Sequence, residues 1–273
     1  MKRLLSVAIA MILCFCCFAL PLKAVTDSTT PLLNTTLLAQ LKLFLAGINE
    51  TISGCDFNGD NAVTTLDLAI LKIKLSGNEE IIPMLNFTKN GYIIEERAGV
   101  TYIDGVLVVN KTYGLPQNYS PDKIVDECQK AFDEMKKGAK KDGISIWVSS
   151  GYRSFNTQKK LYNNYCKSDG VINADTYSAR PGHSEHQTGL AIDVNKASSA
   201  AYKTTYKKVG EWLEENCWNY GFIIRYPKGK EHITGYIHEP WHVRYVGKEY
   251  ARKIKASGLC LEEYLGIDSK YAY

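Results

Sequence analysis

Two histidines and two acidic residues stand in tightly patterned segments of the second half of the chain. His186 and Asp193 lie in the stretch His-Ser-Glu-His-Gln-Thr-Gly-Leu-Ala-Ile-Asp at 183–193, and His242 ends the stretch Glu-Pro-Trp-His that begins at Glu239. Imidazole nitrogens and carboxylate oxygens are ligands that divalent zinc accepts, and three protein ligands leave a fourth position for water. The sequence therefore predicts a catalytic zinc site on His186, Asp193 and His242, with Glu239 within reach of it.

These residue types predict a hydrolytic reaction. Zinc lowers the pKa of a bound water toward about 7, which makes hydroxide available at neutral pH. Glu239 is then the natural general base and the later proton donor to a leaving amine. Arg153 follows a predicted strand and precedes a predicted helix, where a guanidinium can stabilise an oxyanion. The alternatives are a surface Arg153 paired with a loop and a structural Asp193 bonded to backbone amides.

The elements that must position these residues are read from hydrophobic periodicity. Asp193 lies among apolar neighbours, and a buried carboxylate needs a cation or a strong partner. The pattern indicates an α+β domain with a small antiparallel sheet flanked by helices. Helices are predicted at 122–140, 156–166, 201–216 and 247–257, and strands at 102–110, 144–148, 189–194, 222–226 and from 239 onward.

The motifs of this domain resemble those of the VanY-type zinc D-alanyl-D-alanine carboxypeptidases, a family that includes D,D-dipeptidases and some peptidoglycan endopeptidases. The resemblance covers about residues 95–265 and rests on S-x-H-x-x-G-x-A-x-D at 184–193, E-x-W-H at 239–242 and S-G-Y-R-S at 150–154. It implies substrates that are peptidoglycan peptides ending in D-alanyl-D-alanine. It also implies zinc on the three ligands named above, Glu239 as the base, Arg153 on the scissile carbonyl, and a substrate pocket lined by Ser184, Gln158 and Trp241.

Residues 31–80 contain an internal repeat at an offset of 30, in which Leu38-Ala39 aligns with Leu68-Ala69. Each copy predicts an amphipathic helix closed by glycine. Oxygen ligands ahead of the second helix follow the spacing of a calcium loop, with side chains at positions 1, 3, 5 and 12 and a backbone carbonyl at position 7. An acidic turn without an ion is the alternative. The predicted calcium ligands are Asp56, Asn58, Asp60, Ala62 and Asp67.

A duplicated helix with such a loop resembles a type I dockerin, a small calcium-dependent module. The resemblance implies binding to a cohesin domain of a scaffold protein. In the first repeat, however, the offset places Thr26, Ser28, Thr30 and Leu37 at the ligand positions. We therefore expect one intact and one degenerate calcium half, and a plain two-helix spacer is the alternative.

An export signal is expected at residues 1–24, where Lys2 and Arg3 precede a long apolar run and Ala24 offers a small residue for cleavage. A retained membrane anchor is the alternative. Removal of this segment lowers the formal charge from +4 to near +1, because it carries Lys2, Arg3 and Lys23. So balanced a charge disfavours nucleic acid as a partner. The predicted order is the signal at 1–24, the dockerin-like module at 25–80 and the peptidase domain at 81–273.

Five cysteines follow the predicted signal, and none forms a CxxC pair, which disfavours a cysteine zinc site. Export to an oxidising compartment would permit a disulfide between Cys166 and Cys217, and one thiol would remain unpaired. The chain is thus expected to be secreted, cell-wall associated and active in removing the terminal D-alanine of stem peptides. Cleavage of the free dipeptide or of another wall peptide bond is one alternative, and a catalytically inactive wall-binding or scaffold protein is the other.

Overall fold

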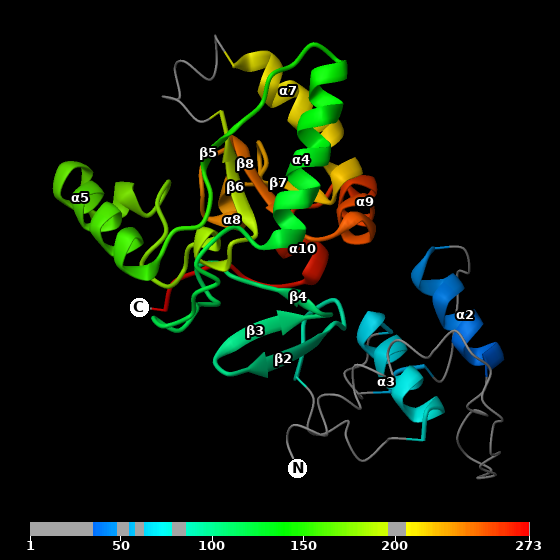
Figure 1. Ribbon diagram of the computed structural model, residues 1–273. Coiled ribbons are helices and arrows are strands. Elements are labelled where there is room, and N and C mark those ends of the chain that lie inside the picture. Colours follow the sequence, from blue (N-terminus) through cyan, green and yellow to red (C-terminus); the bar gives the residue numbers. More distant parts are fainter. Residues whose placement is uncertain (1–34, 48–54, 58–62, 78–85, 196–205, 273) are drawn as a thin grey trace. The chain divides into compact units, whose positions relative to one another are not determined.

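The computed structural model describes residues 35–47, 55–57, 63–77, 86–195 and 206–272. The chain divides into two compact units, residues 1–93 and 94–273, and each is described by itself (Figure 1). The predicted signal at 1–24 lies outside the described residues. In the part that is described, no helix is long and apolar enough to cross a membrane.

The first unit contains the two helices that the internal repeat predicts, α2 (Thr35–Leu45) and α3 (Thr65–Leu75). Gly47 and Gly77 follow them with φ of 70° and 73°, the left-handed conformation that ends many helices. The helices bury a small apolar cluster that includes Leu41 and Leu71. Each helix alone would leave this apolar face exposed to water, so their pairing follows from the repeat itself.

Asp67 is fully buried in the first turn of α3. Its carboxylate accepts hydrogen bonds from the backbone N–H of Phe57 at 2.6 Å and of Thr64 at 2.7 Å. These contacts cap the helix and tie it to the preceding segment. The other predicted calcium ligands are Asp56, which is half-buried, and Asn58, Asp60 and Ala62, which lie outside the described residues. The calcium loop stays a prediction.

A small sheet has the strand order β1-β2-β3-β4. A single strand over 102–110 is the wrong prediction here, because the chain reverses between β3 and β4. Asp104 and Gly105 form the two-residue turn with φ of 48° and 80°, both in the left-handed region, as a type I′ hairpin turn requires. The strands are β1 (Asn86–Phe87), β2 (Ile93–Arg97), β3 (Val100–Ile103) and β4 (Val106–Leu107).

The central sheet of the second unit has the order β5-β6-β8-β7 and is antiparallel throughout. The strand predicted at 144–148 is displaced, since β5 begins at Val148. The side chain of Asn195 accepts the backbone N–H of Trp147 at 2.8 Å and so replaces a ladder bond there. The strands are β5 (Val148–Ser150), β6 (Ala191–Val194), β7 (Phe222–Tyr226) and β8 (Glu239–Tyr245).

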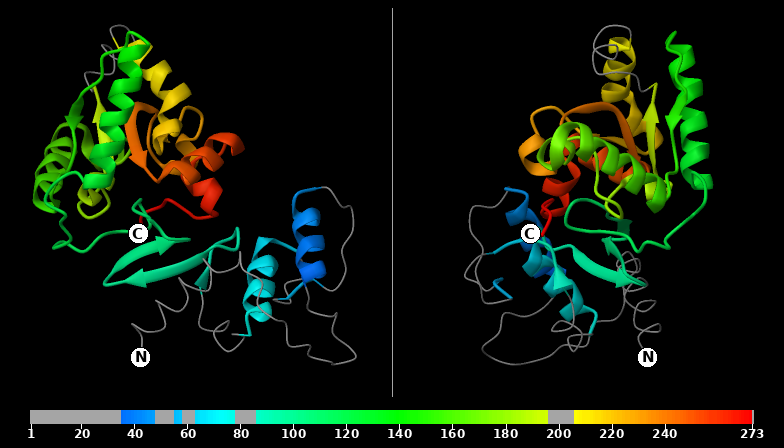
Figure 2. Two further views of the ribbon diagram at one scale, coloured as in Figure 1. Left: turned by 45° about the vertical axis from the view of Figure 1, so that its right-hand side comes forward. Right: turned by 90° about the vertical axis from the view of Figure 1, so that its left-hand side faces the viewer.

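Helices surround this sheet (Figures 1 and 2). The helix expected at 156–166 begins at Phe155, where Ser154 accepts the N–H of Thr157, and it runs past a break at Gly170. The helical segments of the unit are α4 (Asp126–Lys141), α5 (Phe155–Ala174), η2 (Glu185–Thr188), α7 (Lys207–Asn216), η3 (Cys217–Tyr220), α8 (Glu231–Thr234), α9 (Lys248–Ser257) and α10 (Leu261–Leu265).

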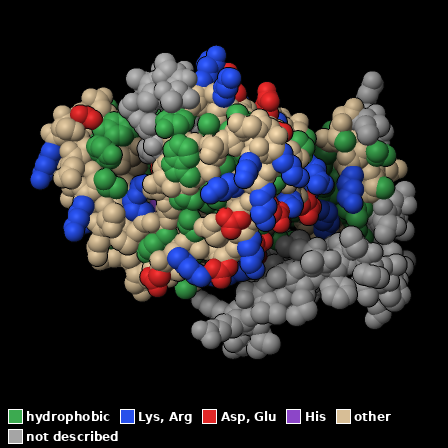
Figure 3. Space-filling model, turned by 45° about the horizontal axis from the view of Figure 1, so that its top comes forward, with side chains coloured by type: hydrophobic (Ala, Val, Ile, Leu, Met, Phe, Trp, Pro, Cys, Tyr) green, Lys and Arg blue, Asp and Glu red, His purple; other side chains and the backbone are tan. Residues whose placement is uncertain are grey.

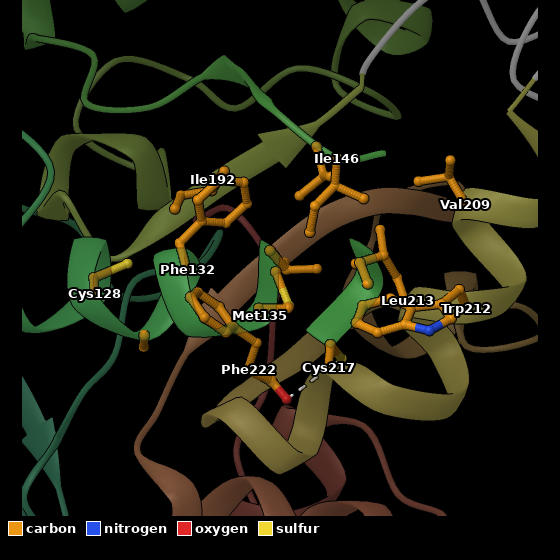
Figure 4. Packing of buried hydrophobic residues seen from close by; sticks show 14 residues of the cluster. Cys128, Phe132, Met135, Ile146, Ile192, Val209, Trp212, Leu213, Cys217 and Phe222 are labelled. Atoms are coloured by element: carbon orange, nitrogen blue, oxygen red, sulfur yellow. Dashed lines mark hydrogen bonds between the residues drawn. The ribbon is translucent and has the colours of Figure 1, made fainter. Parts of the chain in front are cut away.

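The main hydrophobic core lies between one face of the central sheet and helices α4 and α7 (Figure 4). Phe132 and Met135 of α4 and Leu213 of α7 meet Ile192 of β6 and Val243 of β8. The opposite face of the same strands is thereby left for polar side chains. On the outer surface, Lys and Arg lie among Asp and Glu (Figure 3), with ion pairs such as Lys248–Glu134 at 3.3 Å and Lys253–Glu249 at 2.7 Å.

The disulfide that an oxidising compartment would permit between Cys166 and Cys217 is not formed in the structure, because the five described cysteines are all free. Cys217 is part of the hydrophobic core, where its thiol donates to the carbonyl of Phe222 at 3.4 Å (Figure 4). Cys166 lies on α5, which contributes no residue to that core. Burial raises the pKa of the Cys217 thiol to about 12, which makes it inert.

Candidate active site

The site lies on the face of the central sheet that does not meet the core. Strands β6 and β8 pair so that Asp193 stands directly opposite His242, while the preceding pair, Ile192 and Val243, points into the core. Successive side chains of a strand alternate between faces, so one register fixes both the core and the site. Asp193 is fully buried and His242 is 4% exposed.

An irregularity in β8 brings Glu239 to the same place. In a regular strand, residues three apart point to opposite faces. The register between β7 and β8 shifts, so that Ile224 pairs with Val243 but Tyr226 pairs with Glu239. This β-bulge re-aims the side chains, and a carboxylate oxygen of Glu239 lies 3.8 Å from Nδ1 of His242. The predicted base, Glu239, and the predicted ligand, His242, thus share one short, bent segment.

His186 enters from η2, one short turn before β6. Gly189 ends that turn with φ of 69°, and an added Cβ there would lie 2.5 Å from the carbonyl oxygen of Lys123, so glycine is required. Nδ1 of His186 donates to the carbonyl of Gly151 at 2.7 Å. Nε2 is therefore the nitrogen that remains for a ligand, and it lies 3.4 Å from Asp193 Oδ1.

His242 faces Asp193 with Nδ1, whereas His186 faces it with Nε2. Its Nδ1 lies 3.1 Å from Oδ1 of Asp193, and its Nε2 lies 3.3 Å from Oε2 of Glu185. The two histidine rings meet edge to face with their centroids 5.0 Å apart. One ligand atom from each of His186, Asp193 and His242 can be chosen so that all lie within 4.8 Å of one another. Among the residues that the structure describes, these three form the group of His, Cys, Asp and Glu side chains that could hold a metal ion.

The three predicted ligands influence each other's protonation. Burial lowers the pKa of His186 to about 4 against the opposing charge of Asp193. Burial alone would raise the pKa of Asp193, but His186 and His242 hold it well below its usual range. For His242 burial would lower the pKa, yet the hydrogen bonds to Asp193 and Glu185 raise it to about 9. Such close mutual perturbation is typical of functional sites.

Glu185 belongs to the site although the sequence motifs did not single it out. It is 1% exposed, and its Oε1 accepts hydrogen bonds from Arg225 Nε at 2.7 Å and Arg244 Nη1 at 2.9 Å. Arg225 also forms a forked pair with Glu262 at 2.8 and 2.5 Å. These four charges balance, which is how such groups can be buried. The sequence did contain one signal for this network, because Arg225 and Arg244 are charged residues within otherwise apolar stretches of β7 and β8.

Arg153 reaches the site from the loop after β5. Its Nη2 lies 3.9 Å from Asp193 Oδ2 and donates to Ser150 Oγ at 2.9 Å, and its Nη1 donates to Gln158 Oε1 at 2.9 Å. Gln158 is 1% exposed and donates to the carbonyl of Ala179 at 2.6 Å. The side chain of Gln158 therefore orients the guanidinium. Burial lowers the pKa of Arg153, opposed by Asp193.

A pocket of about 330 Å³ opens over these residues. Ser184, Gln158 and Trp241, the predicted substrate residues, all line it, and the aromatic ring of Tyr226 lies 5.0 Å from the ring of His242. The pocket also contains Arg153, His186, Glu239 and His242. The two histidines, the predicted base, the arginine and the predicted substrate residues thus line one cavity, and Asp193 is buried behind it against both histidines, while the roles of all these residues stay predictions.

The donor set fits zinc. Two imidazole nitrogens and one carboxylate oxygen are typical zinc ligands, and catalytic zinc sites use three protein ligands. Each histidine has its other ring nitrogen occupied by an oxygen acceptor, the carbonyl of Gly151 or the carboxylate of Glu185. Such outer partners fix the ring and leave one nitrogen for the metal. The arrangement is therefore suited to one zinc ion with a carboxylate and an arginine beside it.

Comparison with known proteins identifies the family. Residues 121–248 match the model of VanY, D-alanyl-D-alanine carboxypeptidase. A putative carboxypeptidase, YodJ, of Bacillus subtilis (strain 168) is 42% identical over 180 residues, which are 58% of this chain and 65% of YodJ. The chain thus spans just under two thirds of that relative's length.

Two solved structures are similar. The LD-carboxypeptidase LdcB is 42% identical with a TM-score of 0.59, and the match covers 66% of this chain and 98% of LdcB. A mutant of the vancomycin resistance D,D-pentapeptidase VanY, in complex with Zn(II), is 37% identical with a TM-score of 0.52, covering 58% of this chain and 97% of that one. The chain belongs to the VanY family of D-alanyl-D-alanine carboxypeptidases.

Proposed function

We propose that this chain is a zinc-dependent carboxypeptidase that removes the C-terminal D-alanine from peptidoglycan stem peptides ending in D-alanyl-D-alanine. The observation that carries the proposal is the convergence of His186, Asp193 and His242 within 4.8 Å of one another at the wall of a pocket that Glu239 and Arg153 also line. Membership of the VanY family and the Zn(II) complex of a related VanY support it.

His186 Nε2, Asp193 Oδ1 and His242 Nδ1 would hold the metal. When bound, zinc supplies Lewis acidity toward a carbonyl and lowers the pKa of water at the site. The carboxylate of Glu239, beside His242, would accept the proton of the attacking water and later deliver it to the amine of the departing D-alanine. The β-bulge that places Glu239 3.8 Å from His242 supports this role, because it brings the carboxylate beside the proposed metal site.

Arg153 would stabilise the negative charge that develops on the scissile carbonyl oxygen. Its two terminal nitrogens are already fixed by Ser150 and Gln158, so the guanidinium needs no reorganisation when charge appears. Gln158 thereby acts through Arg153. Ser184 and Trp241 line the same pocket and would contact the peptide.

The decisive test combines activity with metal content. The purified chain is incubated with a muramyl pentapeptide, released D-alanine is quantified, and zinc is measured in the same sample. Glu239→Gln is expected to retain zinc and fold but to lose about 10²–10⁴-fold in rate, the usual contribution of a general base. Unchanged hydrolysis by this variant would reject the mechanism, and an inactive, zinc-free wild type would support the wall-binding alternative.

A second reaction within the same class is favoured by one observation. The LD-carboxypeptidase LdcB matches this chain over 98% of its length at 42% identity, against 37% for the D,D-pentapeptidase VanY. Product analysis on three substrates separates the choices: the pentapeptide, the tetrapeptide with a single terminal D-alanine, and free D-alanyl-D-alanine. Release of D-alanine from the tetrapeptide alone would replace the D,D proposal by L,D cleavage, and cleavage of the free dipeptide alone would indicate a dipeptidase.

The first unit would determine where the enzyme is located and would take no part in catalysis. We propose an exported, wall-associated chain whose dockerin-like module binds calcium through its second repeat and docks on a cohesin. The paired helices α2 and α3 at the 30-residue offset support the duplication. Calcium-dependent pull-down with cohesin domains tests the docking, and a chain that binds none with calcium present would reduce the module to a spacer.

A further inference from the structure

The buried carboxylate of Glu185 contacts a predicted metal ligand but has no part in the reaction proposed above. It lies between His242 and two arginines, and each oxygen has its own partners. Oε2 faces Nε2 of His242 at 3.3 Å, and Oε1 accepts from Arg225 at 2.7 Å and Arg244 at 2.9 Å. All four side chains are at most 4% exposed, so water does not compete for these bonds.

The charges around Glu185 determine that its carboxyl group is ionised and that His242 is the donor in the hydrogen bond between them. Two guanidinium groups on one oxygen keep the carboxylate charged, so both of its oxygens are acceptors. Nε2 of His242 must then carry a proton and donate it. A histidine that binds a metal is neutral and has only one N–H, so with Nε2 protonated it is Nδ1, which faces Asp193 at 3.1 Å, that gives up its proton and offers a lone pair to the metal.

We propose that Glu185 is a positioning residue that fixes the tautomer and orientation of His242 so that Nδ1 binds the metal. The inference rests on the proposed zinc site. Arg225 and Arg244 hold the carboxylate in place, and Glu262 balances the second positive charge through its forked pair with Arg225. His186 is fixed differently, by the carbonyl of Gly151, and so presents Nε2.

Glu185→Gln tests this role sharply because glutamine has the same shape but only one acceptor oxygen. Two charged donors, Arg225 and Arg244, converge on Oε1, so the amide oxygen is expected there and the NH₂ group must face His242. Nε2 would then have to accept, which moves the imidazole proton to Nδ1. That nitrogen could no longer bind a metal without losing the new hydrogen bond.

The matched control is Glu262→Gln. It removes one negative charge from the same buried network and contacts the same Arg225, but Glu262 has no contact with His242 among the bonds of the described residues. Both substitutions therefore disturb the charge balance of the network. Only Glu185→Gln alters the group that faces the ligand.

The measurement is zinc affinity of the full-length chain, determined by competition with a chromophoric chelator, with circular dichroism on the same samples. Glu185→Gln is expected to bind zinc about 10–100-fold more weakly, as loss of an outer-sphere partner typically does. Glu262→Gln is expected to stay within about twofold of wild type. Equal zinc affinity in wild type and Glu185→Gln, or an equal loss in both variants, would overturn the proposal. A wild type that binds no zinc would instead overturn the proposed function.

A second measurement needs no variant and so does not depend on folding of a substituted chain. Long-range ¹H–¹⁵N correlation spectra of the zinc-loaded wild type identify which ring nitrogen of each histidine carries a proton. His242 is expected to be protonated at Nε2 and His186 at Nδ1. A His242 that is protonated at Nδ1 and bound through Nε2 would refute the role of Glu185, whatever the variants do.

Discussion

Replacing Gly189 by alanine is expected to destabilise the second unit and to weaken metal binding together. Gly189 lies between the ligands His186 and Asp193 and has φ of 69°. The left-handed conformation costs a residue with a Cβ roughly 1–2 kcal/mol. The less flexible unfolded chain offsets about 0.4–1 kcal/mol of that cost.

The surroundings of Gly189 add a second penalty. A Cβ at this position would lie 2.5 Å from the carbonyl oxygen of Lys123 and 3.0 Å from Pro121 Cγ, so the backbone must shift. Overpacking of this kind costs about 1–3 kcal/mol. The total is about 1–5 kcal/mol, equivalent to a fall in Tm of roughly 2–20 °C for a unit of this size.

Gly143→Ala provides the comparison. Gly143 has a similar φ of 75°, but an added Cβ there would meet nothing within 4 Å, so only the conformational cost applies. Thermal unfolding followed by circular dichroism should show a loss of at most about 1.6 kcal/mol for Gly143→Ala. Zinc affinity should fall for Gly189→Ala alone, because the shift moves the turn that carries His186. Equal stability of the two variants would refute the reasoning from the Lys123 contact.

Three further expectations follow from burial and charge. In a native chain that lacks residues 1–24, Cys166 should react with a thiol reagent rapidly and the four buried cysteines only after unfolding; a native chain without a reactive thiol would contradict this. Although burial opposes it, hydrogen bonds from Arg180 and Tyr162 lower the pKa of Asp175, so its stabilising effect is present above pH ~4 and lost as the pH falls further. Asp175→Asn should therefore cost ~1–3 kcal/mol at neutral pH and progressively less in acid, as measured by denaturant unfolding. Removing metal with a chelator should abolish D-alanine release and lower Tm, and zinc at about a thousand times its Kd should restore ~4 kcal/mol; a Tm independent of zinc would speak against a metal site. The four buried cysteines of the thiol-reagent experiment are Cys55, Cys128, Cys217 and Cys260.

The proximity of the predicted site residues could be anticipated from the sequence. His186, Asp193 and His242 are of types that zinc binds, and their short motifs could be recognised without coordinates. The structure brings these three side chains together beside a pocket lined by Glu239 and Arg153. Helices α4 and α7 also follow from apolar periodicity, since their buried residues recur at helical spacing.

What the sequence did not yield depends on contacts between distant segments. Glu185, Arg225 and Glu262 come from a short turn, a strand and a late helix, and only the fold joins them. The bulge in β8 is a matter of register, which side-chain types do not encode locally. The turn at Asp104-Gly105 did have a readable signal, because this dipeptide is favoured in two-residue hairpins. The pairing of Cys166 with Cys217 failed because sequence gives no information on distance.

The shared use of strands β6 and β8 by core and site restricts how this protein can change over generations. Deleting one residue before Asp193 within β6 would turn its carboxylate toward Phe132 and Met135 and expose Ile192 to the pocket, so stability and chemistry would be lost in one step. Length variation should therefore be purged within these two strands and tolerated in the connections between elements. A change in the length of β6 or β8 would therefore affect activity and folding together.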